Sequence, residues 1–388
     1  MLKSKKICVV SGSRAEYGLL KEVIFKLHKS KYFNLKFVVT GSHLSKKYGF
    51  TLKEIQEDRI PISKLIDINL GSDNPVGVSK SMSIGLNKFV KIYEKLEPDL
   101  ILVLGDRYEI LSAGLAATLC RIPIAHIHGG EITQAALDDV FRHCLSKMAH
   151  IHFSATKDYK KRIVQLGENP KNVFNVGGLG VDAIKKCNLY TKKNIENKLN
   201  FKFKKKNILV TCHPETLNEK SSKRNFQEII NALNRLNDVC IVFTMPNHDI
   251  DNQIIKNMIL KFVNKKRNSF FFKSLGQKMY FSFCAQVDCL VGNSSSGLLE
   301  MPTFKKFTIN IGDRQKGRLK AKSVIDCKFN TTEILKKINF TFSIDNKKKI
   351  MNVKNPYGDG GASDRIFSIL KRVKLDQIIN KEFYNLKK

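Results

Sequence analysis

Short apolar runs of strand length alternate with stretches of helical periodicity along most of the chain. Such alternation is typical of a parallel sheet with helices on both faces, because each strand is followed by a helix that returns the chain to the opposite edge. The predicted strands are KKICVVSGS, LKFVVTGS, DLILVLGDR, IPIAHIHGG and IHFSAT, followed by NILVTCHPE, VCIVFTMPN, SFFFKSL, VDCLVGNSSS and FTINIGD. The sequence therefore predicts an α/β protein built from two doubly wound, Rossmann-like domains.

The length agrees with this division, since 388 residues exceed what one hydrophobic core usually organises. A polar, lysine-rich stretch begins between Gly177 and Lys206 and marks the changeover. We expect a first domain over residues 1–185, a second over 186–367, and a helical tail over 368–388 that packs back on the first domain. Two such domains facing each other leave a cleft, and ligands of open parallel sheets bind beyond the carboxyl ends of the strands.

The formal net charge of +33 would attract polyanions such as nucleic acid. However, the lysines are spread through nearly every segment, and aromatic residues are not interleaved with them as stacking platforms. A solvated, lysine-rich surface is the preferred interpretation, so no specific nucleic acid is expected as a partner. A basic RNA-binding protein remains an alternative that rests on charge alone.

The chain contains no apolar run of about 18 residues, and MLKSKKICVV leads into a strand rather than a signal peptide. Its nine cysteines are scattered and contain no Cys-x-x-Cys pair, so they are expected to be reduced packing residues. These features predict a cytoplasmic protein without a membrane partner.

The strand VDCLVG is followed by Asn293 and by three serines where a helix would begin. Backbone N–H groups, the positive end of the helix dipole and serine hydroxyls favour an anion there. Glu300, one turn later on the face of Ser296, could accept hydrogen bonds from ribose hydroxyls. The segment predicts a phosphate site, and the alternative is an ordinary serine N-cap with a solvent-exposed glutamate.

The turn GSRAEYG over residues 12–18 also follows a strand and opens a helix. It does not match Gly-x-Gly-x-x-Gly, and the next strand ends in TGSH without an acidic residue for a dinucleotide ribose, so a nicotinamide cofactor is disfavoured. Arg14 at the helix start suits a diphosphate, to which its planar fork can donate two hydrogen bonds. The alternative is a surface arginine.

Two predicted strands deliver polar residues to the carboxyl edge of the first sheet. DLILVLGDR ends in Asp106 and Arg107, a charged pair that is rarely only structural at the end of a central strand. In IPIAHIHGGE the period of two puts His126 and His128 on one face. We therefore expect these side chains to converge.

A His-x-His pair could hold a metal only with a third ligand, which Glu131 or Asp138 would have to supply. Buried histidines hydrogen-bonded near a phosphate are preferred, so no metal is expected. One of Asp138 and Asp139 is expected to be the N-cap of the following helix, and the other to reach the cleft. His150 and His152 are expected to be structural.

In the second half of the chain, VTCHPET ends a strand with His213, and FTMPNHD ends another with Asn247. Both side chains are expected at the carboxyl edge of the sheet, aimed at the interdomain gap, where they could meet a diphosphate or a base. This domain would therefore form the nucleotide-binding side.

Six motifs occur in order along the chain: GSRAEYG, VLGDRYE, AHIHGGE, HPET, GNSSSG and NIGDRQKGR. Together they resemble the hydrolysing UDP-N-acetylglucosamine 2-epimerases, and the likeness is closest to the bacterial sialic-acid-pathway members. The resemblance implies a glycosyltransferase-B-like fold, no metal or redox cofactor, and a homodimer or homotetramer. It implies the catalytic residues Asp106, His128, Glu131 and Asp138. The implied substrate- and nucleotide-binding residues are Arg14, Arg107, His126, Arg142, His213, Asn247, Ser294, Ser295, Gly297, Glu300 and Arg314.

The resemblance also implies anti elimination of UDP to give a 2-acetamidoglucal, followed by addition of water that leaves N-acetylmannosamine. The proton on carbon 2 is not acidic, so departure of the diphosphate must lead, and nearby carboxylates would stabilise positive charge at carbon 1. Some similar enzymes carry a glutamate with an acid/base role at the position of His128. Here either His128 itself moves the proton, or Glu131 and Asp138 share the task.

The sugar is open at this stage. UDP-N-acetylglucosamine is preferred, for nonulosonic (sialic) acid biosynthesis. A UDP- or GDP-linked 2,4-diacetamido-2,4,6-trideoxyhexose, from the legionaminic acid pathway, is the first alternative. A retaining glycosyltransferase on the same fold is an alternative of another class, and it would need an acceptor site.

Overall fold

The structure is a computed structural model that describes residues 4–46, 49–71, 74–133, 137–213, 222–245, 252–273, 275–375 and 378–386. The chain forms two compact units. The first comprises Met1–Ile132, Ala136–Ala183 and Gly360–Lys388, and the second comprises Thr133–Ala135 and Ile184–Asp359.

The first unit contains a parallel seven-stranded sheet with the order β3-β2-β1-β4-β5-β6-β7. Its strands are β1 (Lys5–Ser11), β2 (Phe33–Thr40), β3 (Lys64–Ile66), β4 (Leu100–Leu104), β5 (Ile124–Ile127), β6 (Ile151–Ser154) and β7 (Val173–Asn175). Its helices are α1 (Arg14–His28), α2 (Leu52–Glu57), α3 (Pro75–Leu96), α4 (Tyr108–Leu119), α5 (Leu137–Met148), α6 (Lys157–Gln165), α7 (Leu179–Lys186) and α15 (Ala362–Arg372). The strand order reverses between β1 and β4, which makes their carboxyl ends the switch point of a doubly wound sheet.

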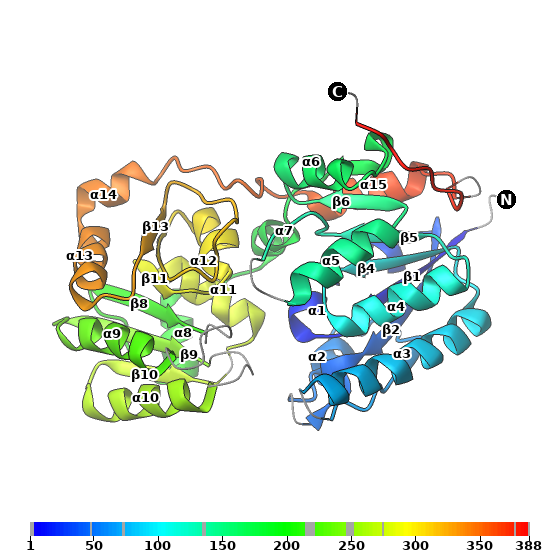
Figure 1. Cartoon of the computed structure of the whole chain (residues 1–388). Coiled ribbons are helices and arrows are strands. Elements are labelled where there is room, and N and C mark those ends of the chain that lie inside the picture. Colours follow the sequence, from blue (N-terminus) through cyan, green and yellow to red (C-terminus); the bar gives the residue numbers. More distant parts are fainter. Residues whose placement is uncertain are drawn as a thin grey trace. The chain divides into compact units, whose positions relative to one another are not determined.

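Alternation along β1 divides the interior of this unit into two layers. Ile7 and Val9 pack with α1 and α15 on one face, whereas Cys8 and Val10 pack with α3, α4 and α5 on the other. Figure 1 shows α3 and α4 lying side by side along the sheet. Because both faces are covered, β4 is buried along its whole length, as expected from its apolar sequence LILVL.

The second unit contains a parallel six-stranded sheet with the order β10-β9-β8-β11-β12-β13 (Figure 1). Its strands are β8 (Lys206–Thr211), β9 (Val239–Thr244), β10 (Ser269–Phe272), β11 (Cys289–Gly292), β12 (Phe307–Ile311) and β13 (Val324–Cys327). Its helices are α8 (Lys192–Leu199), α9 (Ser222–Asn234), α10 (Asn252–Lys265), α11 (Gly276–Gln286), α12 (Ser296–Leu299), α13 (Thr331–Phe342) and α14 (Ile344–Lys349). Its switch point lies between β8 and β11, so the predicted fold of two doubly wound units is confirmed.

The carboxyl-terminal segment belongs to the first unit. Helix α15 packs against α1, and Asp182 accepts hydrogen bonds from the backbone N–H groups of Gly361 and Ser363 at 2.7 and 3.0 Å. The expected helical tail over 368–388 is helical only to Arg372. Residues 378–386 form an irregular segment that contacts the first unit through Lys381 and Tyr384. Within the described ranges, no helix has the length and apolar character needed to cross a membrane.

Candidate functional site

Asp106 lies between β4 and α4, at the switch point of the first sheet. Its carboxylate pairs with the guanidinium of Arg142, a residue of α5 that is 3% exposed. Arg142 also donates to the backbone carbonyl of Glu131 at 3.1 Å and to Asp139 Oδ1 at 3.2 Å. Arg142 was expected to bind substrate, whereas these three contacts join its side chain to parts of the chain around Asp106.

Arg107 occupies the N-cap position of α4. Its Nε donates to Oε1 of the buried Glu109 at 2.6 Å, while the Arg107 side chain stays 43% exposed. The charge of Glu109, with smaller contributions from Glu16 and Asp138, outweighs the opposing effect of burial and keeps the pKa of Arg107 above its usual value. Arg107 is therefore a fixed cation at the end of β4.

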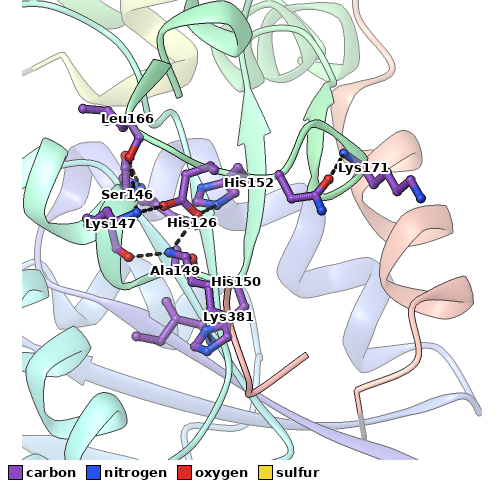
Figure 2. Close-up of polar contacts among 12 residues, drawn as sticks. His126, Ser146, Lys147, Ala149, His150, His152, Leu166, Lys171 and Lys381 are labelled. Atoms are coloured by element: carbon purple, nitrogen blue, oxygen red, sulfur yellow. Dashed lines mark hydrogen bonds and ion pairs between the residues drawn. The ribbon is translucent and has the colours of Figure 1, made fainter. Parts of the chain in front are cut away.

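His126 lies on β5 and is fully buried. Its Nε2 is 2.7 Å from the carbonyl oxygen of Gly105, which can only accept, so Nε2 carries a proton. Its Nδ1 then accepts from the hydroxyl of Ser146 at 3.2 Å (Figure 2). Burial lowers the pKa of His126 to about 3, although the bond to Gly105 opposes this shift. His126 is thus neutral, and both of its ring nitrogens are used within the protein rather than left for a substrate.

His128 does not share a strand face with His126, contrary to the expectation from the period of two. β5 ends at Ile127, and His128 adopts a left-handed conformation with φ of 64°. This turn directs its ring elsewhere: Nε2 accepts from the backbone N–H of Leu179 at 3.4 Å, and Nδ1 is 3.6 Å from Glu131 Oε1. His128 and Glu131 thus form a partly buried imidazole–carboxylate pair next to the Asp106–Arg142 ion pair.

Asp138 and Asp139 both lie in the first turn of α5, so neither is its N-cap and that expectation is wrong. Asp138 is exposed, whereas Asp139 is half-buried against Arg142 and His143. Arg14, the first residue of α1, is half-exposed and lies 3.6 Å from Glu54. Both Asp138 and Arg14 are accessible at the carboxyl edge of the sheet.

His150 and His152 have structural contacts, in agreement with the sequence. His150 Nδ1 accepts from the N–H of Ile124 at 3.2 Å. His152 lies opposite His126 on the neighbouring strand and contacts the buried Glu168 at 3.0 Å. Lys147 and Lys381 also pair with Glu168, at 2.9 and 2.7 Å (Figure 2).

In the second unit, the fully buried Asn293 joins the segments after β8, β11 and β12. Its side chain accepts from the N–H of His213 at 2.7 Å and donates to the carbonyl of His213 at 2.9 Å. Its own carbonyl accepts from Arg314 at 3.2 Å and from Gln315 at 2.9 Å. Burial, with a smaller contribution from the charge of Arg314, lowers the pKa of His213 to about 3, so His213 is neutral.

The serine segment after β11 begins a helix of one turn, α12. Gly292 has φ of 139°, and a Cβ there would lie 2.0 Å from the carbonyl of Thr211, so only glycine fits. Ser295 is at the N-cap position without a side-chain capping bond, which excludes the ordinary serine N-cap at that residue. Ser294 is buried and accepts from the N–H of Ser296 at 3.4 Å.

Glu300 accepts a hydrogen bond from Ser296, the residue expected on the same helix face. Burial raises the pKa of Glu300, and the bond from Ser296 opposes this shift. Gly297, which is expected to bind the nucleotide, packs so closely on β12 that a Cβ would lie 2.4 Å from Thr308 Cγ2.

Asn247 lies outside the described residues. Within the described ranges, no group of three or more His, Cys, Asp or Glu side chains is arranged to hold a metal ion. Glu16, Glu109 and Ser146 were not predicted as site residues, because their roles depend on burial and on contacts between separate segments, such as Glu109 with Gly12 and Ser146 with His126.

Structural comparison shows the same fold in a solved enzyme. The UDP-GlcNAc 2-epimerase of Neisseria meningitidis bound to UDP-GlcNAc superposes with a TM-score of 0.79 at 21% identity, covering 94% of this chain and 99% of that one.

Sequence comparison extends over almost the whole chain. A GDP/UDP-N,N'-diacetylbacillosamine 2-epimerase (hydrolyzing) of Campylobacter jejuni is 39% identical over 388 residues, which are 99% of this chain and 100% of that one. A UDP-N,N'-diacetylbacillosamine 2-epimerase (hydrolyzing) of Legionella pneumophila is 35% identical over 97% of this chain and 98% of that one. Residues 25–371 match the sequence profile of the UDP-N-acetylglucosamine 2-epimerases. The chain belongs to the UDP-N-acetylglucosamine 2-epimerase family.

Proposed function

We propose that this protein is a hydrolysing 2-epimerase of a nucleotide-activated 2,4-diacetamido-2,4,6-trideoxyhexose. The observation that carries the proposal is the similarity over at least 97% of the chain to two relatives named for N,N'-diacetylbacillosamine. The sequence motifs alone had favoured UDP-N-acetylglucosamine, and the two relatives shift the preference to the diacetamido sugar. The nucleotide is UDP or GDP, since one relative is named for both.

In the proposed first step, the bond between carbon 1 and the diphosphate oxygen breaks, and the nucleoside diphosphate leaves with the electron pair. A base removes the proton from carbon 2, which gives an unsaturated glycal. Water then adds its hydroxyl to carbon 1, and a proton is delivered to carbon 2 from the other face. Atoms balance with water as the only co-reactant.

Asp106 is suited to stabilise the positive charge that develops at carbon 1, because Arg142 fixes its carboxylate at the end of β4. We assign the proton transfer to His128 Nε2, which would exchange its long 3.4 Å hydrogen bond from the N–H of Leu179 for the substrate proton, while Nδ1 faces the carboxylate of Glu131 at 3.6 Å. Asp138 contributes negative charge near Arg107.

The nucleotide-binding roles are proposed residue by residue. We assign the diphosphate to Arg14 and Arg107, and the nucleotide to His213, Ser294, Ser295, Glu300 and Arg314, with Asn247 from the sequence resemblance. His126, Arg142 and Gly297 are reassigned from substrate contact to support of this site, because their groups are engaged in the contacts described above.

The test is incubation with UDP- and GDP-N,N'-diacetylbacillosamine and with UDP-N-acetylglucosamine, followed by proton NMR of the released sugar in heavy water. We expect the diacetamido sugar to be released as its 2-epimer with deuterium at carbon 2, and heavy-oxygen water to label carbon 1. Retention of the original proton at carbon 2 would exclude the elimination, and an unepimerised sugar would indicate simple hydrolysis.

UDP-N-acetylglucosamine is the second candidate, since it is the substrate named for the family and the ligand of the Neisseria enzyme. A kcat/KM for this sugar at least as high as for both diacetamido sugars would establish it and refute the first candidate.

A further inference from the structure

Two buried glutamates meet at the switch point of the first sheet. Glu16, in the first turn of α1, is 5% exposed, and Glu109, in the first turn of α4, is 1% exposed. These helices follow the adjacent strands β1 and β4, so their first turns lie together. Both carboxyl groups approach Gly12: its N–H donates to Glu16 Oε2 at 2.7 Å, and a Cβ on Gly12 would lie 2.6 Å from Glu109 Cγ.

Glu109 orients one edge of Arg107. Its Oε1 accepts from Arg107 Nε at 2.6 Å, which fixes the plane of the guanidinium. Among the described residues, no hydrogen-bond or ion-pair partner is found for the two Nη groups of Arg107, whose side chain is 43% exposed. The edge of the guanidinium that suits bidentate binding of an anion is therefore left available.

The two carboxyl groups differ in what neutralises them. Glu16 Oε1 and Glu109 Oε2 are both buried without a hydrogen-bond partner, which is costly for an ionised oxygen. Glu109 has the cation of Arg107, whereas Glu16 has the backbone N–H of Gly12 and the hydroxyl of Ser13. Burial and the charge of Glu109 raise the pKa of Glu16 to about 8, against the opposing effects of Arg107, Gly12 and Ser13.

We propose that Glu16 and Glu109 are positioning residues for Arg107, with Glu109 ionised to orient the guanidinium and Glu16 protonated to keep the group neutral. The inference rests on the proposed function, in which Arg107 binds the anionic substrate. Ionisation of Glu16 would give the Glu16–Glu109–Arg107 group a net negative charge, which would repel a nucleoside diphosphate and compete with it for the guanidinium.

The groups that act on Glu16 come from two parts of the chain. Glu109 and Arg107 belong to α4 and its cap, and Gly12 and Ser13 belong to the turn before α1. Another titratable group near this turn is His43 of the 3-10 helix Gly41–Leu44, whose Nε2 is 3.0 Å from the hydroxyl of Ser11. Burial lowers the pKa of His43 to about 4, so it stays neutral over the pH range of the test.

The first test compares the KM of the full-length enzyme at pH 9 and at pH 7. For wild type we expect KM to rise about tenfold, since only about a tenth of the molecules keep the Glu16 proton at pH 9. For Glu16→Gln, whose side chain is neutral at both pH values, we expect a ratio near one. Glu97→Gln is the matched control, because Glu97 is an exposed glutamate of the same unit paired with Lys6, and it should behave as wild type. An equal rise in Glu16→Gln, or none in wild type, would overturn the proposal.

A second measurement does not depend on turnover. Infrared spectroscopy of the ligand-free protein at pH 7 should show the carbonyl band of a buried protonated carboxyl group in wild type and in Glu97→Gln, and lose it in Glu16→Gln. If the band behaves in this way but no nucleotide sugar is turned over, the proposed function fails while the protonation of Glu16 stands. If the band persists in Glu16→Gln, the assignment of the proton to Glu16 is wrong.

The role of Glu109 is tested by a double-mutant cycle. Glu109→Gln should raise KM about tenfold and change kcat less than about threefold, since an oriented ground-state contact is weakened. In an Arg107→Lys background, which removes the Nε donor, Glu109→Gln should have no further effect on KM. Additive effects of the two substitutions on KM would show that Glu109 does not act through Arg107.

Discussion

The buried guanidinium of Arg142 connects the carboxylate of Asp106 to the backbone carbonyl of Glu131. Asp106 ends one strand segment and Glu131 follows the next, so a single side chain from α5 sets the spacing between the two acidic residues assigned to the sugar. The spacing of Asp106 and Glu131 therefore depends on Arg142, which need not touch the substrate.

Arg142→Lys should lower kcat about tenfold to a hundredfold while UDP affinity stays close to wild type, because lysine cannot maintain the planar fork that holds both partners. Turnover at saturating substrate and calorimetric titration with UDP would measure the two effects. Arg121→Lys, on the exposed surface of the same unit, serves as the control. Unchanged kcat in Arg142→Lys would show that the spacing of Asp106 and Glu131 does not limit catalysis.

His128→Gln and His128→Ala should both lower kcat about a hundredfold to ten-thousandfold with little loss of UDP affinity, if His128 transfers the proton. Both substitutions place a non-glycine residue in the left-handed conformation of position 128, so any backbone strain is common to the two variants. A difference in kcat between them therefore reports on the side chain alone. Glutamine keeps a polar group of similar reach but cannot accept and release a proton. Near-normal turnover of the glutamine variant would remove His128 from the mechanism and leave Glu131 or Asp138 as the base.

Asn293→Asp should weaken UDP binding by roughly 1 to 3 kcal/mol, because the carboxylate cannot donate to the carbonyl of His213 and leaves it unsatisfied. The same loss should lower the melting temperature. Asn234→Asp, exposed at the end of α9, is the matched control in this unit. UDP affinity equal to wild type, in a variant that melts earlier, would mean that Asn293 supports the fold but not the nucleotide site.

Lys381→Met should destabilise the protein by about 1 to 3 kcal/mol at pH 7, because it removes one partner from the buried Glu168. Lys374→Met, an exposed lysine on the same segment, is the control and should leave the melting temperature unchanged. Equal melting temperatures for wild type and Lys381→Met would show that the tail contact contributes nothing.

The same carboxylate predicts an acid dependence of stability. Burial would raise the pKa of Glu168, but His152, Lys381 and Lys147 outweigh it and lower the pKa from 4.5 to about 2. Its stabilisation is therefore present above pH 4.5 and is lost as the pH falls through about 2. The difference in unfolding free energy between wild type and Glu168→Gln should shrink over this interval, and a constant difference would contradict the pairing.

All ten strands expected from the sequence are present, because each lies in a longer, mainly apolar run, although β5, β6, β10 and β11 themselves have only four residues. The sequence analysis missed β3, β7 and β13, which are only three or four residues long and partly exposed, so their pattern resembles that of a loop. The prediction that His128 shares a strand face with His126 was wrong for a related reason. Side chains alternate only within a strand, and β5 ends at Ile127, one residue before His128.

Motif residues such as Asp106 and Ser295 could be chosen as candidates from the sequence, because polar residues directly after a predicted strand indicate a site. The supporting contacts could not, since Glu109 with Gly12 and Asn293 with His213 join segments that no local pattern relates. Arg142 was implied by the family resemblance, but whether it binds substrate or holds Asp106 depends on burial, which a single sequence does not specify.

The discontinuity of the first unit has a consequence for biosynthesis. Residues 184–359 of the second unit emerge from the ribosome before Ile366 and Leu370, which complete the core of the first unit around α1. The usual order, in which the amino-terminal domain folds first, therefore cannot run to completion here. A nascent chain that stalls after residue 359 would leave the apolar surface of α1 uncovered, and would expose the first unit to chaperones and proteases.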